Sequence, residues 1–307
     1  MSRTRLAMVA AACFAIVRPL EAGAQVTRPR TSVQRTAVTA VSCNSTAPTS
    51  RAPAVSPSLT WRGEPAMRWT EWPVALGTRG VRARVIVVDI DPSRVRLDLE
   101  IARDGDEVRP WSLDDAPADA AVAFNAGQFT DDGPWGWVVH RGREWQGPGT
   151  GPLAGTVVVD SAGHVTISAA APLRGARPQG LREGVREALQ SFPMLLLDGR
   201  PAPLLCDPKA SLDRTHRDIR FAIGTRADGH VLLALTRYEG VGALSARLPV
   251  GPTTHETAEL MRRLGAQQAL MLDGGLSAQL LVREGTDTHR WEGMRRVPLA
   301  IVGKRIP

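Results

Sequence analysis

The chain has 307 residues, of which 43% are hydrophobic and 22% are charged, a composition typical of a globular protein and unlike that of a wholly disordered one. The net charge is +7, but residues 1–60 contain seven Arg and one Glu, a balance of +6, so the rest of the chain carries only +1. A nucleic-acid-binding protein needs positive charge clustered on its folded part, so this distribution argues against that class.

The first residues have the pattern of a secretory signal peptide. Arg3 and Arg5 precede an uncharged apolar run over residues 6–17, and Ala22-Gly23-Ala24 offers a cleavage site near Ala24. Such a run is short for a membrane span, and no later stretch is long and apolar enough to be one. We therefore predict a signal peptide over residues 1–24 and a secreted or periplasmic protein, with an uncleaved anchor as the alternative.

Residues 25–60 are rich in Ser, Thr, Pro, Ala and Arg and show no periodicity, which predicts a disordered tether. We expect a single globular domain over residues 61–307. Cys43 and Cys206 are compatible with a disulfide in an oxidising compartment, but the sequence leaves their pairing open. Because no Cys or His spacing is typical of a metal site, we expect no cofactor and leave a divalent metal and the oligomeric state open.

The first half of the domain consists of short strand patterns. Residues 81–90 and 95–101 flank the turn Asp91-Pro92-Ser93 and predict a hairpin. The next predicted strands are 120–124, 138–140, 156–160 and 164–168, the last two forming another hairpin.

Two polar residues stand at the ends of these strands. Asn125 offers both a donor and an acceptor, so it is a candidate for a ligand contact or for a turn cap. His140 is a candidate site residue, with an ordinary buried or solvated histidine as the alternative.

The second half adds two predicted helices. Leu181, Val185, Ala188 and Leu189 follow helical spacing and predict a helix over residues 181–189. Residues 253–264 predict another, because Thr253 and Glu256 have capping-box spacing and Gly265 suits the C-terminal end. The remaining predicted strands are 194–197, 221–224, 231–235, 269–272 and 297–302. This combination predicts an α+β fold with a mixed or largely antiparallel sheet and two main helices.

The strand at 269–272 runs directly into Asp273, Gly274 and Gly275. Two glycines permit unusual backbone angles and a close approach of a ligand. Ser277 and Gln279 alternate with apolar residues, as along a second strand. This pattern predicts a carboxylate, a hydroxyl and an amide at one rim of a sheet, and the alternative is a tight hairpin turn.

A charged segment, residues 213–220, precedes the strand at 221–224. It contains Arg214, His216, Arg217 and Arg220. These side chains are candidates for binding a phosphate or carboxylate, because a planar guanidinium presents paired donors. The alternative is a solvated loop in which Arg and Asp residues pair with each other.

Four stretches occur in an order that resembles the phosphodiester glycosidase family. They are F-N-A-G-Q-F at 124–129, L-Q-S-F-P-M-L at 189–195, R-F-A-I-G at 220–224 and L-D-G-G-L-S at 272–277. The family typically shows N-G-G-F-F, Q-S-G-P-M, R-T-A-I-G and L-D-G-G-G-S, and the resemblance covers roughly residues 80–305. The chain departs from the pattern at Ala126, Gln128, Phe192, Phe221 and Leu276.

The resemblance implies a hydrolase that cleaves a sugar-1-phosphodiester in an envelope or extracellular glycan; bacterial members are linked to exopolysaccharide. Such cleavage needs a carboxylate that activates water or stabilises an oxocarbenium-like transition state, and cations for the phosphate. We predict Asp273 as the carboxylate, Arg220 as the cation, and Asn125 as a third catalytic residue. The predicted substrate-binding residues are Gly127, His140, Gln190, Ser191, His216, Arg217, Gly274, Gly275, Ser277 and Gln279. Candidates for a second carboxylate are Asp213, Asp218 and Glu239.

Two other classes of protein fit the same sequence. The domain is alternatively a non-catalytic envelope module that binds polysaccharide or peptidoglycan, or a structural protein whose polar rim consists only of turns. The distinguishing observation is whether Asn125, Arg220 and Asp273 come together in space.

Overall fold

The structure is a computed structural model that describes residues 34–43, 57–104, 107–151, 154–169, 184–240, 248 and 250–307. The predicted signal peptide lies outside the described residues, as does much of the predicted tether. Within the described residues, no helix has the length and apolar character needed to span a membrane.

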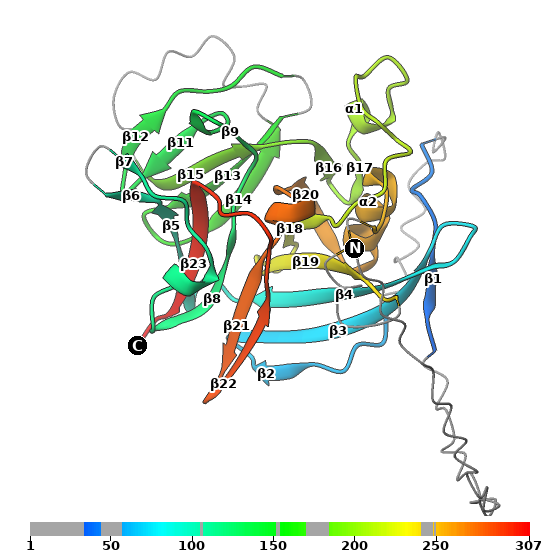
Figure 1. Cartoon of the computed structure of the whole chain (residues 1–307), viewed down its shortest axis with the longest axis horizontal. Helices are drawn as coiled ribbons and strands as arrows, with labels where there is room; N and C mark the ends of the chain where they lie inside the picture. The colour runs from blue at the N-terminus through cyan, green and yellow to red at the C-terminus, as the bar shows by residue number, and fades with distance from the viewer. Residues whose placement is uncertain are drawn as a thin grey trace, which may run out of the picture. The chain divides into compact units, whose positions relative to one another are not determined.

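The largest sheet has nine strands, and its pairs are antiparallel except for β1 with β3. Figure 1 shows β3, β4 and β19 lying side by side in this sheet. The spatial order is β1 (Thr36–Val38), β3 (Met67–Leu76), β4 (Val81–Ile90), β19 (Val231–Tyr238), β18 (Phe221–Arg226), β20 (Ala266–Met271), β16 (Met194–Leu197) and β17 (Arg200–Pro201), with β2 (Arg62–Glu64) paired to β3.

Two five-stranded antiparallel sheets accompany it. One has the order β22 (Asp287–Trp291), β21 (Leu280–Glu284), β8 (Ala120–Asn125), β23 (Leu299–Arg305) and β5 (Val95–Ile101). The other has the order β12 (Arg143–Gln146), β11 (Val138–His140), β15 (Val185–Ser191), β13 (Gly155–Asp160) and β14 (Val165–Ala169). Short pairs join β9 (Phe129–Thr130) to β10 (Gly133–Pro134) and β6 (Arg103–Asp104) to β7 (Glu107–Val108).

The predicted hairpin over residues 81–101 is wrong in its pairing, although both strands exist. β4 pairs with β3 and β19 in the large sheet, whereas β5 pairs with the last strand, β23. The Asp91 turn therefore carries the chain from one sheet to another. The predicted hairpin of β13 and β14 is confirmed.

The predicted helix at 181–189 is also wrong where the structure describes it. β15 starts at Val185 and lies between β11 and β13, with Ala188, Leu189 and Gln190 buried. Strand pairing on both sides outweighs the weak helical spacing. The described helices are α1 (Pro203–Cys206) and α2 (Thr254–Arg263), with 3-10 turns η1 (Leu113–Asp115) and η4 (Gly275–Ser277). The fold is therefore mostly β rather than α+β, with largely antiparallel pairing as predicted.

The prediction for α2 is confirmed in detail. The Thr253 hydroxyl accepts from the Glu256 amide at 3.2 Å, and the Thr253 amide donates to the Glu256 carboxylate at 2.9 Å. Gly265 follows the helix with φ of +88°, the left-handed conformation that glycine adopts at a helix end.

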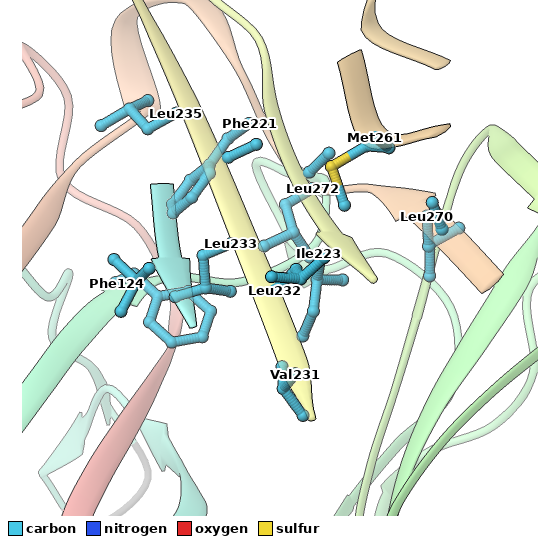
Figure 2. Packing of buried hydrophobic residues seen from close by; sticks show 14 of the residues in the cluster. Phe124, Phe221, Ile223, Val231, Leu232, Leu233, Leu235, Met261, Leu270 and Leu272 are labelled. Carbon is cyan, nitrogen blue, oxygen red and sulfur yellow. The ribbon is translucent and has the colours of Figure 1, made fainter. Parts of the chain in front are cut away.

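The core joins the large sheet to the sheet that contains β8. Phe124 on β8 and Phe221 on β18 are fully buried, and their rings meet edge to face with centroids 5.7 Å apart. Figure 2 labels both residues among the members of one buried hydrophobic cluster, which also contains Leu233 of β19. Because the chain leaves β8 at Asn125, one residue after Phe124, this packing fixes where that polar strand end lies.

Part of the predicted tether is built into the domain. Thr36–Val38 form β1, and Val38 is fully buried against the core. Cys43 forms a disulfide with Cys206 at the end of α1. The pairing that the sequence left open is thus present, and it attaches residues 34–43 to the segment that leads into residues 207–220.

Candidate active site

A cleft of about 480 Å³ opens where several strand ends and loops meet. Asp273 and Arg220 both line it, although 53 positions separate them in the sequence. Its lining residues are Gln128, Phe129, Phe192, Pro193, Leu212, Asp213, His216, Asp218, Arg220, Thr254, Met271, Leu272, Asp273, Gly274, Gly275, Leu276, Ser277 and Arg295. The expectation that an acid group and a guanidinium share one cleft is therefore met by the geometry.

Backbone hydrogen bonds hold the Asp273 strand end from both sides. The Asp273 amide donates to Ala126 O at 3.0 Å, and the Leu272 amide donates to Phe221 O at 2.8 Å. The Gly275 amide donates to Ile219 O at 2.8 Å. The end of β20 is thus tied to β8 on one side and to the start of β18 on the other.

The two glycines after Asp273 are needed for this close packing. A Cβ on Gly274 would lie 2.5 Å from the Ile219 carbonyl oxygen. Gly275 has φ of +55°, which favours glycine, and a Cβ there would lie 3.0 Å from a carboxylate oxygen of Asp218. The pair brings the 218–220 backbone against the Asp273 turn.

Asp273 occupies an environment that favours its neutral form more than water does. Burial raises the pKa of the Asp273 carboxyl, and the negative charge of Asp218 adds to that rise. Hydrogen bonds from Ser277 and the Gly274 amide, and the charge of Arg295, act in the opposite direction. A carboxylate with a raised pKa is a stronger base than an exposed one, which suits the activation of water.

Arg220 supplies a partly buried cation. Its guanidinium donates to His216 O at 2.9 Å and to Pro252 O at 3.3 Å. Within the described residues no carboxylate lies at ion-pair distance from it, and burial lowers the pKa of Arg220 while the charges of Asp218 and Asp213 oppose that shift. A guanidinium held by neutral carbonyls retains charge for an anionic ligand.

Arg295 is a second cation in the cleft, and sequence reasoning missed it. It precedes β23, and its guanidinium lies 4.7 Å from the centroid of the Phe129 ring. Its guanidinium forms an ion pair with Asp131 at 3.8 Å, and its charge acts on Asp273. No local pattern marks it, because it reaches the cleft only through the tertiary fold, in which β8 lies between β21 and β23.

His216 and two candidate second carboxylates also line the cleft. His216 Nε2 lies 3.5 Å from an Asp218 carboxylate oxygen. Asp213 accepts from the Thr215 and His216 amides and shapes the turn. Glu239 lies elsewhere, in ion pairs with Arg35 and Arg84. Of the three candidates, the structure places Asp213 and Asp218 in the cleft.

Asn125 lies behind the cleft and does not line it. It is fully buried, its amide nitrogen donates to Asp273 O at 2.8 Å, and its amide oxygen accepts from the Gln279 amide at 2.9 Å. Gln279 is buried as well, and its side chain accepts from the Leu113 amide at 3.1 Å. Both predicted ligand contacts are instead supports of the backbone that carries Asp273 and Ser277.

The Gln190-Ser191 pair supports the neighbouring loops. The Gln190 side chain accepts from the Trp137 and Gly149 amides at 2.9 and 2.8 Å. The Ser191 hydroxyl lies 2.5 Å from Met271 O and 2.7 Å from the Gln128 side-chain oxygen. Both residues are buried and outside the cleft lining.

Three further predicted residues are also absent from the cleft lining. Arg217 forms a two-pronged ion pair with Glu256, with both distances 2.8 Å. His140 lies 2.9 Å from Glu187 in the sheet of β11 and β15. A Cβ on Gly127 would lie 2.7 Å from Gln190 O, so Gly127 is a packing residue. Ser277, Gly274, Gly275 and His216 do line the cleft, as predicted.

Among the described residues, no group of three or more His, Cys, Asp or Glu side chains is arranged to hold a metal ion.

Comparison with known proteins agrees with these motifs. A model of the phosphodiester glycosidase family matches residues 118–303, which include Asp273, Arg220 and Arg295. No curated protein matches the sequence.

Solved structures show the same fold. The catalytic domain of zebrafish N-acetylglucosamine-1-phosphodiester alpha-N-acetylglucosaminidase, auto-inhibited by its pro-peptide, is similar with a TM-score of 0.59 and 13% identity, over 80% of this chain and 88% of that one. A hypothetical protein from Synechocystis is similar with a TM-score of 0.57 and 18% identity, over 81% of this chain. The match spans 64% of the length of the Synechocystis protein.

Proposed function

Since the chain belongs to the phosphodiester glycosidase family, we propose that it hydrolyses the bond between the anomeric carbon of a sugar and a phosphodiester. The substrate is a sugar-1-phosphodiester of an envelope or extracellular glycan. One observation carries the proposal: Asp273 and Arg220 line the same cleft, each held by backbone contacts from a different strand end.

The roles follow from the charges in the cleft. Asp273, with its raised pKa, activates water or stabilises the oxocarbenium-like transition state. Arg220 and Arg295 bind the phosphate that leaves the anomeric carbon. The phosphate monoester that leaves the anomeric carbon is already a good leaving group, so little help from a general acid is needed. Asp218 is the proposed second carboxylate, because its negative charge acts on both Asp273 and Arg220.

The proposed location is outside the cytoplasm. It is supported by the signal-peptide pattern of residues 1–24 and by the disulfide between Cys43 and Cys206, because structural disulfides persist in oxidising compartments.

The test is turnover of a defined diester by the purified protein. The methyl diester of α-N-acetylglucosamine-1-phosphate is incubated with the parent and the Asp273→Asn and Arg220→Ala variants, and released sugar and methyl phosphate are quantified. We expect a loss of at least 100-fold in kcat/KM for each variant, the scale seen when one transition-state contact is removed. The matched controls are Asp119→Asn and Arg96→Ala, both at exposed side chains outside the cleft, and these should retain parental activity.

Full activity in either Asp273→Asn or Arg220→Ala would refute the proposed mechanism. Glycan binding without any turnover of sugar-1-phosphodiesters would instead identify a non-catalytic binding module.

A further inference from the structure

Large apolar side chains that face water gather at the cleft. Phe192 is 37% exposed and Leu276 is 47% exposed, and both line the cleft that contains Asp273. Met294 is 64% exposed, and its amide donates to Leu276 O at 2.7 Å. Exposed apolar groups that cluster at a functional cleft indicate a surface that is covered when a ligand binds.

Hydrogen bonds of the backbone and one cation–π contact link the residues along this side of the cleft. Gln128 holds Phe192 through two hydrogen bonds, its amide nitrogen to Phe192 O at 2.6 Å and the Phe192 amide to its side-chain oxygen at 3.0 Å. Phe129, which follows Gln128 in the chain, has its ring against the Arg295 guanidinium. The Arg295 amide donates to Leu276 O at 3.0 Å. We call Phe192, Phe129, Arg295 and Leu276 the apolar wall.

The Phe192 ring is held in place by a second ring. Trp135 packs against it edge to face, with centroids 4.9 Å apart and planes at 74°. A ring that packs against a second ring, on a backbone held by two hydrogen bonds with the Gln128 side chain, loses little freedom when a ligand covers it. Phe192 and Leu276 also stand where the family motifs have glycine, so the wall is a feature of this chain.

The proposed function, on which this inference rests, puts a phosphate in the same cleft. We infer that the apolar wall binds a hydrocarbon group esterified to that phosphate, so that the aglycone is an alkyl or isoprenoid chain and not a second sugar. A sugar needs hydrogen-bonding partners for its hydroxyls, and Leu276 and Phe192 offer none from their side chains. Arg295, with its side chain on the Phe129 ring, places a positive charge beside the apolar surface, as an alkyl phosphate requires.

The test compares the methyl and octyl diesters of α-N-acetylglucosamine-1-phosphate. We expect kcat/KM to be at least tenfold higher for the octyl diester, since several of its methylenes leave water. Phe192→Ala and Leu276→Ala should each reduce that octyl-to-methyl ratio by about threefold or more. The matched control is Leu204→Ala, at a leucine on α1 that is 37% exposed and outside the cleft lining, and it should leave the ratio unchanged.

A binding measurement separates this inference from the proposed function. Calorimetry with octyl phosphate and methyl phosphate, below the micelle concentration, reports the wall without any turnover. If no diester is cleaved but octyl phosphate binds at least tenfold more tightly and Phe192→Ala removes the difference, the wall is supported and the proposed function fails. Equal cleavage of both diesters with equal binding of both phosphates overturns the inference and leaves the proposed function standing.

Discussion

Replacement of Asn125 by alanine tests whether this residue supports the site or contacts substrate. The Asn125 side chain is fully buried, and its two shortest hydrogen bonds are to backbone groups: it donates to Asp273 O at 2.8 Å and accepts from the Gln279 amide at 2.9 Å. Alanine leaves both groups without these partners. Each buried polar group that loses its partner costs about 1–3 kcal/mol, so Asn125→Ala should lower the free energy of unfolding by about 2–6 kcal/mol.

Denaturant unfolding followed by circular dichroism measures this loss, and kcat and KM for the methyl diester are measured on the same preparations. We expect kcat to fall with stability, because the Asp273 backbone loses its anchor. Gln267→Ala, at an exposed glutamine, is the control and should change stability by no more than about 0.5 kcal/mol. An Asn125→Ala variant that keeps parental stability but binds the diester weakly would refute the structural role and restore the substrate contact.

Three further predictions concern the same region. Because burial raises the pKa of Asp273, its ionised form lowers the free energy of unfolding at neutral pH, so Asp273→Asn should unfold at a higher temperature than the parent. The difference should disappear below about pH 4, where the carboxyl is protonated in both the folded and the unfolded state. An Asn variant that is less stable than the parent at neutral pH would contradict this expectation. Gly274→Ala should reduce kcat/KM by at least about tenfold, because the new Cβ would lie 2.5 Å from Ile219 O. The control Gly147→Ala, whose Cβ would have its nearest neighbour at 4.0 Å, should leave kcat/KM unchanged. Equal activity of the two variants would show that the Asp273 turn tolerates displacement. Reduction of the disulfide between Cys43 and Cys206, which are 163 residues apart, should lower the free energy of unfolding by about 2–5 kcal/mol. The measurement is denaturant unfolding with and without dithiothreitol, and the control is Cys206→Ser, whose stability should not respond to the reductant. A parent protein whose stability is the same with and without the reductant would refute the estimate.

Local chemistry was sufficient for many elements. The capping box of Thr253 and Glu256 and the terminal Gly265 define α2 through contacts within a few residues. The run that ends at Asp273 shows a buried strand opening into a polar turn, and this is also where the family motifs are most recognisable. These features depend on neighbours along the chain, so sequence alone predicts them.

Strand pairing was not predictable in the same way. β4 and β5 are separated by a turn of a few residues, yet they do not pair with each other. β4 lies between β3 and the distant β19, and β5 pairs with β23 at the end of the chain. Residues 185–189 show helical spacing but lie between two strands. A strand forms its ladder with whichever edge the whole fold provides, and a short segment carries no record of that edge.

The sequence by itself determined the resemblance to the family, Asp273 and Arg220 as candidates, and several of the strands, among them β4, β5, β8, β18, β19 and β20. Only the tertiary structure decided which polar residues face the cleft: Asn125, Gln190 and Gln279 turn inward to satisfy buried backbone groups, Arg217 pairs with Glu256, and Arg295 joins the site. The physical reason is that a polar side chain takes the partner its buried surroundings leave unsatisfied, and those surroundings come from residues distant in the chain.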